Sequence, residues 1–307
     1  MNQNSSVAAS VLHDAAQQNY PVSALYVLAT PIGNVCDISL RGLHVLAIAD
    51  AVACEDTRNT SQLLQRYGLS KTLLAAHEHN EREAADKIIE RLRAGQRVAL
   101  VSDAGTPAIS DPGARVVDAV RAAGLPVVPL PGASAAVTAL SASGLTDARF
   151  QFVGFLPAKT RQRETALQEL VALEAALVFY EAPHRIVETV QSMLQVFGPQ
   201  RQIVLARELT KLFEDIHRCP LGEAPAWLEQ DANRQRGEFV VLLEGAQPVD
   251  GEAADAERVL RILLAELPVK QAAALAAQIT GQKKNALYER ALQIRQDARL
   301  DDDVSEQ

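Results

Sequence analysis

Short apolar runs alternate with segments of helical spacing along the first half of the chain. Helical patterns cover residues 60–67 and 80–95, and Gly95 supplies a typical C-terminal stop for the second of them. The apolar runs, each followed by small residues, Pro or Gly, are strand candidates at residues 25–30, 49–56, 97–103 and 125–132. Strands that alternate with helices predict a parallel sheet with both faces covered.

A second set of apolar runs alternates with helical stretches in the middle of the chain. The segment between the last two runs, through Cys219, has the pattern of a hairpin, which predicts a second α/β domain with a mixed sheet. The four runs lie at residues 150–156, 176–181, 202–208 and 237–245.

The residues after Gly245 form an Ala-rich pattern of three short helices, with a turn at Gly281 before the third. This order is typical of a helix-turn-helix module. We therefore expect a disordered leader, an N-terminal α/β domain, a second α/β domain, a C-terminal helix-turn-helix-like module and an acidic tail. Their predicted bounds are 1–22, 23–147, 148–247, 251–299 and 300–307.

Composition narrows the class of protein. The 307 residues are 48% hydrophobic and 22% charged, enough for a sizeable core divided over two or three domains. The first residues have neither the basic segment nor the unbroken apolar segment of a signal peptide. No uncharged apolar run reaches the roughly 20 residues that a membrane helix needs. The three cysteines have neither the spacing of a metal site nor that of a disulfide framework, which fits a reducing compartment. Together these features predict a cytoplasmic protein without a membrane segment.

The loop V-S-D-A-G-T-P-A-I-S-D-P-G at residues 101–113 follows a predicted strand. Ligands of open α/β sheets bind at the carboxyl ends of the strands, where Thr30, Glu55, Asp103 and Pro131 fall. The chain has neither a dinucleotide-binding nor a P-loop signature, and Asp103 and Asp111 would repel phosphate. The loop favours a ligand with hydroxyls, amines or positive charge, although a plain turn with a capping aspartate is an alternative.

Eight motifs occur in the order of one known family. They are L-A-T-P-I-G-N, E-D-T-R, H-E-H-N-E, S-D-A-G-T-P-A-I-S-D-P-G, P-L-P-G-A-S-A, F-V-G-F-L-P-A-K, F-Y-E-A-P-H-R-I and A-R-E-L-T-K. Together they resemble the ribosomal RNA small subunit methyltransferase I family, within the tetrapyrrole methylase superfamily. The resemblance covers residues 25–245, and the C-terminal helices are similar to that family's helix-turn-helix.

The resemblance implies two α/β domains with S-adenosylmethionine in the cleft between them, in a homodimer. It also implies methylation of the ribose 2′-hydroxyl of a cytidine in 16S rRNA, as free rRNA or in the small ribosomal subunit. The expected cofactor-binding residues are Thr30, Pro31, Ser102, Asp103, Ala104, Gly105, Thr106, Pro131, Gly132, Ala133, Ser134 and Tyr180.

Charged residues cluster where predicted strands end. Glu55, Asp56 and Arg58 follow one strand, and Glu181, His184, Arg185, Arg207, Glu208 and Lys211 follow two strands of the second domain. Methyl transfer to a hydroxyl requires close placement of donor and acceptor, and a group that draws the hydroxyl proton. The expected catalytic residues are Glu181, Arg185, Arg207 and Lys211; the alternative is that such groups form ion pairs at a domain interface.

Basic residues mark two candidate RNA contacts. Lys159 and Arg161, in a run with Arg163, follow F-L-P, although such a run is often a solvated face. Between residues 258 and 299 the chain carries eight Lys/Arg against three Asp/Glu, with Lys283 and Lys284 at the start of the third helix. A dimerising or capping bundle is the alternative for these helices.

Other functions and a metal site have weaker support. His77 and His79 lack a third ligand at a supportive spacing, so no metal site is predicted. A tetrapyrrole methylase would resemble G-x-G-x-G-D after the first strand, where this chain has only Gly33. The third alternative is a non-catalytic RNA-binding factor of ribosome assembly.

Overall fold

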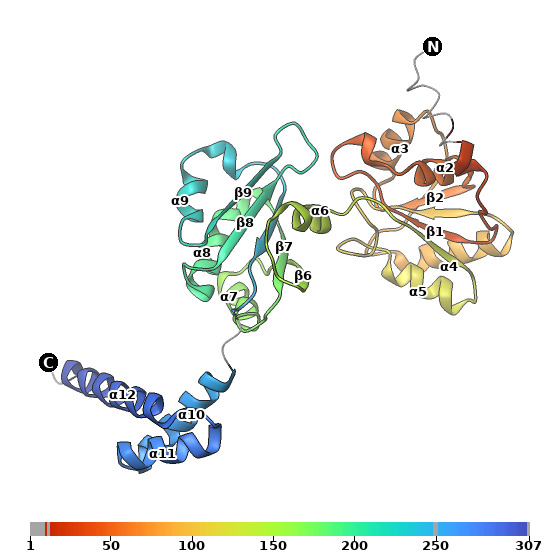
Figure 1. Cartoon of the computed structure of the whole chain (residues 1–307). Coiled ribbons are helices and arrows are strands. Elements are labelled where there is room, and N and C mark those ends of the chain that lie inside the picture. Colours follow the sequence, from red (N-terminus) through yellow and green to blue (C-terminus); the bar gives the residue numbers. More distant parts are fainter. Residues whose placement is uncertain (1–9, 11–12, 248–250, 306–307) are drawn as a thin grey trace. The chain divides into compact units, whose positions relative to one another are not determined.

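The computed structural model describes residues 10, 13–247 and 251–305 (Figure 1). The chain divides into two compact units. Among the described residues, the larger one comprises those up to 171 and 175–244, with two β-sheets, and the smaller one comprises 172–174 and those from 245 onward, with three helices.

The first sheet has five parallel strands in the order β3-β2-β4-β1-β5, which confirms the predicted parallel sheet. The strands are β1 Leu25–Leu28, β2 Ala51–Cys54, β3 Thr72–Ala75, β4 Val98–Leu100 and β5 Val127–Leu130. The sequence pattern did not predict β3. This strand is a four-residue edge strand whose side chains are half-buried or exposed, so it lacks the apolar signal of a central strand.

Helices cover both faces of this sheet because alternate strand residues point to opposite sides. On one face Tyr26 and Leu28 share a core with helices α2 Leu40–Ile48 and α3 Thr57–Arg66. On the other face Leu25 packs with α4 Glu81–Arg93 and α5 Ala114–Ala122 (Figure 1).

The second sheet is mixed, as predicted. Its order is β6-β7-β10-β8-β9, in which only β6 and β7 are parallel. The strands are β6 Phe150–Phe155, β7 Ala176–Glu181, β8 Gln202–Arg207, β9 Asp215–Pro220 and β10 Phe239–Leu243. β8 and β9 form the hairpin that the pattern through Cys219 indicated.

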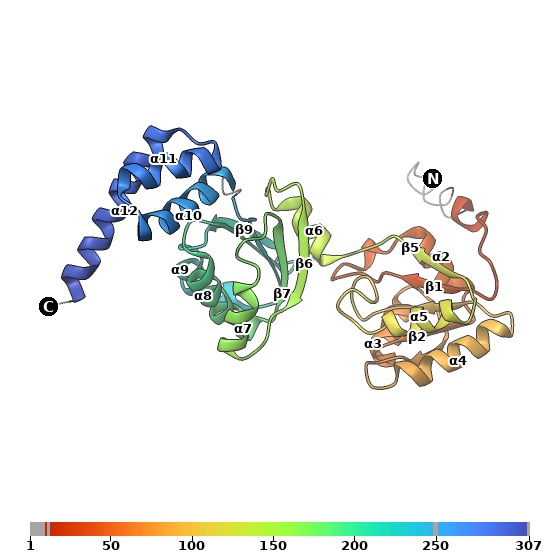
Figure 2. The same cartoon turned by 90° about the horizontal axis from the view of Figure 1, so that it is seen from below.

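Helices lie on both faces of this second sheet (Figures 1 and 2). Helix α6, Ala135–Ala142, packs Ala136 and Ala139 against Val178, Val204 and Leu242 of three strands. On the opposite face lie α7 Thr160–Gln168, α8 Ile186–Phe197 and α9 Ala224–Glu229.

The smaller unit is a three-helix module of α10 Gly251–Glu266, α11 Val269–Thr280 and α12 Lys284–Ser305. Its core joins Leu260 and Leu264 of α10 to small side chains of α11 and to Leu287 of α12. Gly281 ends α11 in the left-handed conformation, with φ of 72°, so the chain turns directly into α12. The helix-turn-helix plan is confirmed.

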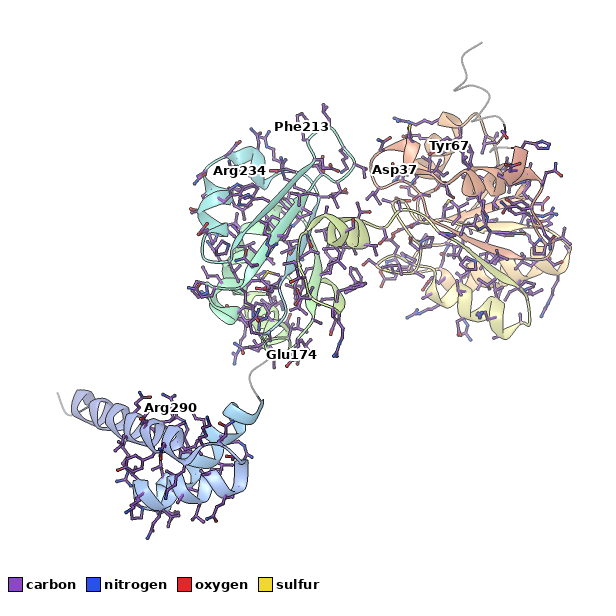
Figure 3. All side chains as sticks on the ribbon, viewed as in Figure 1. Asp37, Tyr67, Glu174, Phe213, Arg234 and Arg290 are labelled. Atoms are coloured by element: carbon purple, nitrogen blue, oxygen red, sulfur yellow. The ribbon has the colours of Figure 1, made fainter. Side chains whose placement is uncertain are left out.

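A charged triad stabilises this module. The Glu257 carboxylate accepts hydrogen bonds of 2.8 Å from Arg261 and 2.9 Å from Arg290, which lower the pKa of Glu257 to about 2. Arg290 is labelled on the helical module in Figure 3. Two of the eight basic residues counted in this region are therefore paired with a carboxylate.

The ends of the chain contain regular structure within the described residues. Residues 13–16 are helical, and Ala15 and Tyr20 are buried in the larger unit, whereas residues 1–9 and 11–12 of the predicted leader lie outside the described residues. Helix α12 continues into the predicted acidic tail as far as Ser305. The domain boundaries given above remain a proposal.

None of the helices in the described part of the chain has the length and apolarity to cross a membrane.

Gly132 allows the loop after β5 to approach β1. A Cβ atom at this position would lie 2.7 Å from the Ala29 Cβ, so Gly132→Ala should lower the free energy of unfolding by about 1–3 kcal/mol. The double variant Ala29→Gly/Gly132→Ala removes the clash and should recover part of this loss in a denaturant melt of the full chain. Equal stability of Gly132→Ala and the unmodified chain would contradict the close packing.

Candidate active site

Two loops at the carboxyl end of the parallel sheet are joined by backbone hydrogen bonds. The Thr30 N–H donates to the Gly105 carbonyl at 2.9 Å, and the Gly105 N–H donates back to Thr30 at 3.0 Å. The Thr30 hydroxyl donates to the Ser102 carbonyl at 3.0 Å. The Ser102 hydroxyl in turn donates to the Gly105 carbonyl at 2.9 Å. Gly105 has a φ of 82°, a backbone conformation that favours glycine. The conformation of this loop therefore depends on glycine at position 105 as well as on these hydrogen bonds.

A third loop joins this pair. The Thr106 hydroxyl donates to the Ala133 carbonyl at 2.9 Å, and Gly132 packs against Ala29. The loops after β1, β4 and β5 therefore form one continuous wall of small residues.

This wall borders a cavity of about 400 Å³, within the usual range for small-molecule sites. Its other side comes from the second sheet and its loops. The lining residues are Ile32, Ala104, Gly105, Thr106, Ile109, Ser110, Asp111, Ser134, Ala135, Phe155, Tyr180, Glu181, Ala182, Pro183, Leu209, Glu238, Phe239 and Val240.

The twelve predicted cofactor-binding residues divide into those that line this cavity and those that do not. Five of those residues line it: Ala104, Gly105, Thr106, Ser134 and Tyr180. The remaining seven do not line it: Thr30, Pro31, Ser102, Asp103, Pro131, Gly132 and Ala133. Of these, Thr30, Ser102, Gly132 and Ala133 hold the loops together through the contacts described above.

Asp103 also has a supporting position. Its carboxylate accepts hydrogen bonds from the Asn59 side chain at 2.7 Å and the Asp56 N–H at 3.2 Å. Asp56 in turn caps α3 through the Arg58 N–H at 2.7 Å, and pairs with the Arg58 side chain. These groups connect the loop after β2 to the loop after β4.

Sequence reasoning missed Asp111 as a cavity residue. Burial raises the pKa of the Asp111 carboxyl and the nearby charge of Asp103 raises it further, although a hydrogen bond with Ser102 opposes both. Burial and the charges of Asp111 and Asp103 also raise the pKa of Glu55. A carboxylate in this position stabilises a cationic group within the cavity, since such a group relieves the repulsion among the three acids.

Tyr180 anchors the second sheet to α6. Its hydroxyl accepts a hydrogen bond of 3.3 Å from the Ala136 N–H, and burial raises its pKa. The Tyr180 ring makes edge contacts with Phe152 and Phe155, with ring centroids 5.0 and 5.7 Å apart. Phe155 is another cavity residue that the sequence analysis did not select.

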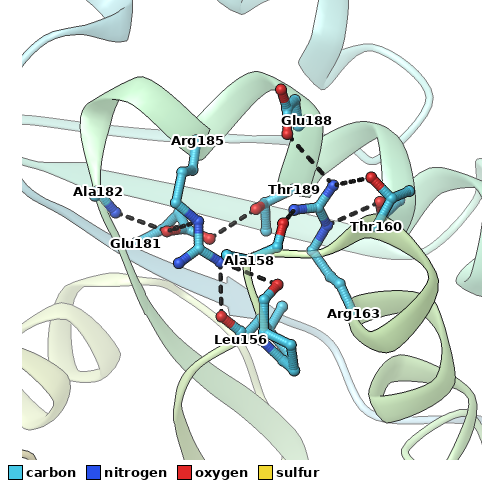
Figure 4. Close-up of polar contacts among 11 residues, drawn as sticks. Leu156, Ala158, Thr160, Arg163, Glu181, Ala182, Arg185, Glu188 and Thr189 are labelled. Atoms are coloured by element: carbon cyan, nitrogen blue, oxygen red, sulfur yellow. Dashed lines mark hydrogen bonds and ion pairs between the residues drawn. The ribbon is translucent and has the colours of Figure 1, made fainter.

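Glu181 and Arg185 form a closed polar network (Figure 4). The Glu181 side chain is fully buried, and its carboxylate accepts from the Thr189 hydroxyl at 2.6 Å and the Ala182 N–H at 2.8 Å. Arg185 pairs with the same carboxylate at 3.3 Å and donates to the Leu156 carbonyl at 2.6 Å. With its oxygens engaged in this way, Glu181 is placed to hold the β7 end in position.

Arg163 does not belong to an exposed basic run, so that interpretation of the sequence was wrong for this residue. Its side chain is 1% exposed and donates to the Ser192 hydroxyl at 3.0 Å and the Ala158 carbonyl at 3.3 Å (Figure 4). The guanidinium fills a polar niche between α7 and α8. Lys159 and Arg161 are exposed, as an RNA contact requires.

Arg207 and Lys211 are engaged with neighbouring groups. Arg207 donates to the Asn233 carbonyl at 3.1 Å and lies 4.0 Å from Asp215. The Lys211 ammonium lies 2.8 Å from both Glu208 and Glu238. Burial lowers the pKa of Lys211, but the two carboxylates outweigh it and raise the pKa, so this side chain stays protonated. None of the four predicted catalytic residues is therefore a free base in this arrangement.

Lys211 also approaches the first domain. A Cβ atom on Gly33 would lie 2.6 Å from the Lys211 Cγ and 2.9 Å from the Thr210 hydroxyl. Thr210 and Glu208 both have positive φ values, 67° and 52°, which cost energy in residues other than glycine. The loop after β8 is therefore held in a specific shape against Gly33.

Comparisons with known proteins agree with the fold and with the C-terminal helical module. Residues 24–225 match the family described as Tetrapyrrole (Corrin/Porphyrin) Methylases, and residues 250–295 match the RsmI C-terminal HTH domain. The chain is similar to the uroporphyrin-III-C-methyltransferase structure from Thermus thermophilus, with a TM-score of 0.52 and 20% identity. That alignment covers 72% of this chain and 94% of the other.

Two curated relatives are much more similar in sequence. Ribosomal RNA small subunit methyltransferase I of Pseudomonas aeruginosa is 54% identical over 272 residues, 88% of this chain and 96% of the relative. The protein of the same name from Escherichia coli O157:H7 is 51% identical over 270 residues, 88% of this chain and 94% of the relative. The chain belongs to the tetrapyrrole methylase superfamily and, within it, to the ribosomal RNA small subunit methyltransferase I family. It is a methyltransferase by family.

The polar network around Glu181 predicts that replacing this glutamate lowers the free energy of unfolding more than replacing an exposed glutamate does. Glu181→Gln leaves Arg185 without a buried counter-charge and should lower the free energy of unfolding by about 3 kcal/mol. Glu169→Gln, at an exposed position directly after α7 that forms no ion pair within the described residues, should change it by less than about 0.5 kcal/mol. A denaturant melt of each full-length variant measures both; equal stabilities would show that the network contributes little.

Proposed function

We propose that this chain transfers a methyl group from S-adenosylmethionine to the ribose 2′-hydroxyl of a cytidine in 16S rRNA. The observation that carries the proposal is the cavity between the small-residue loops and the β7 end, in a chain that is 51–54% identical to two small-subunit rRNA methyltransferases. We propose the small ribosomal subunit or its free rRNA as substrate, in the cytoplasm, with the enzyme acting as a homodimer.

The residues of the cavity fit this cofactor. Ala104, Gly105 and Ser134 present backbone and little side-chain bulk, so a ligand can approach the loops closely. The Asp111 carboxylate suits an ammonium or sulfonium group. S-adenosylmethionine, when bound, supplies an activated methyl group. We propose that Thr30, Pro31, Ser102, Asp103, Pro131, Gly132 and Ala133 support the loops that contact it.

For the acceptor we propose positioning as the main contribution of the second domain. Glu181 and Arg185 fix the end of β7, while Arg207 and Lys211 hold the loop after β8. In a displacement reaction, correct placement of the reacting groups provides much of the rate. Lys211, paired with the cavity residue Glu238, also supplies a positive charge beside the site.

The helical module is proposed to dock rRNA. Lys283 and Lys284 are exposed at the start of α12, the position from which a helix-turn-helix presents side chains to nucleic acid. Their charges displace counterions from phosphate and give affinity with little sequence choice.

Methyl transfer tests the proposal directly. Small subunits from a strain that lacks the corresponding gene should accept one methyl group per subunit, mapped to a cytidine 2′-oxygen. Transfer to a porphyrin instead would favour the tetrapyrrole alternative. Cofactor binding without transfer to either substrate would favour an assembly factor.

Asp111→Asn should weaken S-adenosylmethionine binding, measured by calorimetry, by about tenfold because a charged partner is lost. Burial raises the Asp111 pKa, so affinity in the unmodified chain should fall as the pH falls through that raised value. The affinity of the Asp111→Asn variant should not show this decrease at low pH. Asp118→Asn, on the exposed face of α5, is the control. Unchanged affinity in Asp111→Asn would remove this carboxylate from the site.

The double variant Lys283→Ala/Lys284→Ala should bind small subunits less tightly and reduce the slope of log K against log salt by about 2, about 1 for each cation. S-adenosylmethionine affinity should stay unchanged, since the module is a separate unit. Lys87→Ala on α4 provides a control for loss of surface charge. A salt slope equal to that of the unmodified chain would rule out the docking role of these lysines.

A further inference from the structure

We infer that the acceptor platform, defined as residues 155–161, binds an unpaired stretch of RNA next to the cavity. Phe155 stacks on an exposed nucleobase, and Lys159 and Arg161 bind phosphates of the same strand. The inference rests on the proposed function and adds a base-binding residue to it.

Phe155 is placed for stacking. It is the last residue of the edge strand β6, it lines the cavity, and it is 58% exposed, while the following residue, Leu156, is buried. The Tyr180 ring meets it at 68°, with centroids 5.7 Å apart, and so fixes its orientation from one side. An exposed ring of fixed orientation at a cavity mouth suits a planar partner.

Arg185 secures the chain directly after Phe155. Its guanidinium donates to the carbonyls of Leu156 and Pro157 at 2.6 and 3.3 Å, and is itself held by Glu181 (Figure 4). These bonds fix the direction in which the chain leaves β6.

Arg163 secures the second half of the platform. It donates to the Ala158 carbonyl at 3.3 Å and the Thr160 hydroxyl at 3.4 Å, and is held by Ser192 at 3.0 Å (Figure 4). Two arginines from the protein interior therefore hold the loop between the aromatic ring and the cations. A loop fixed in advance loses little conformational entropy when a ligand binds.

The charges on this platform are available for phosphate. Lys159 and Arg161 are exposed, and neither forms an ion pair within the described part of the chain. An aromatic ring followed by cations is the combination that binds single-stranded nucleic acid, by base stacking and phosphate attraction. One ring offers far less area than the roughly 800 Å² per partner of a standard protein interface, so a nucleotide is the better occupant.

The test measures methyl transfer to small subunits and binding of S-adenosylhomocysteine, the demethylated cofactor, with full-length variants. Phe155→Ala should lower kcat/KM for subunits by about tenfold or more, with cofactor Kd changed less than twofold. Phe155→Tyr keeps a ring and should retain most of the activity. Phe150→Ala is the matched control, since Phe150 is 50% exposed on the same strand and does not line the cavity.

Several results would overturn the inference. Weaker cofactor binding with unchanged KM for subunits would assign the ring to the adenine of the cofactor, and a changed sedimentation coefficient would assign it to a contact between copies of the chain. Full activity of Phe155→Ala would remove it from the site. If the unmodified chain neither binds S-adenosylhomocysteine nor methylates subunits, the proposed function fails and this inference fails with it.

Discussion

The paired hydrogen bonds between Thr30 and Gly105 are the contact on which the rest of the site depends. Neighbouring parallel strands end at the same edge of a sheet, but nothing in the strands themselves brings the loops beyond them together. The Thr30–Gly105 bridge does so without side-chain bulk, and the Thr106 hydroxyl extends it to the loop after β5. A wall of backbone and small side chains results, and it faces the cavity.

Charged residues of the second domain serve this architecture in a different way. Glu181, Arg185 and Arg163 lie largely within the protein. The Glu181 carboxylate accepts hydrogen bonds from the Ala182 N–H and the Thr189 hydroxyl, while the two arginines donate to backbone carbonyls and hydroxyls of the adjoining segments. A buried guanidinium needs several acceptors, and the loop after β6 supplies them. The hydrogen bonds that these buried groups require thereby fix a surface loop beside the cavity. The same polar side chains that stabilise the second domain therefore also shape the surface next to the proposed site.

The sequence was sufficient for the main plan of the fold. Apolar runs followed by Gly and Pro mark the ends of strands. They located the loops at Thr30, Gly105 and Ser134 and indicated one parallel and one mixed sheet, but not the order of the strands within either sheet. The turn at Gly281 likewise revealed the helix-turn-helix. The edge strand β3 was missed because its T-L-L-A stretch is short and only partly buried.

Side-chain roles were harder to predict because sequence does not show direction. Arg163 follows Lys159 and Arg161 in one run, yet its position on α7 turns it inward, whereas they remain exposed. Phe155 and Asp111 lie in two of the family-like motifs of the sequence, but their place at the cavity depends on how the two sheets are brought together. Asp103 was expected to contact the ligand. Its carboxylate accepts a hydrogen bond from Asn59, and we propose that it supports the loop.

The central claim is that the methyl donor occupies this cavity, and a crystal structure of the full chain with S-adenosylhomocysteine tests it most directly. The account predicts density in contact with the loop at residues 104–106, with Ser134, and with Asp111. Density for the ligand at any other place on the chain, with the cavity free of it, would contradict the account.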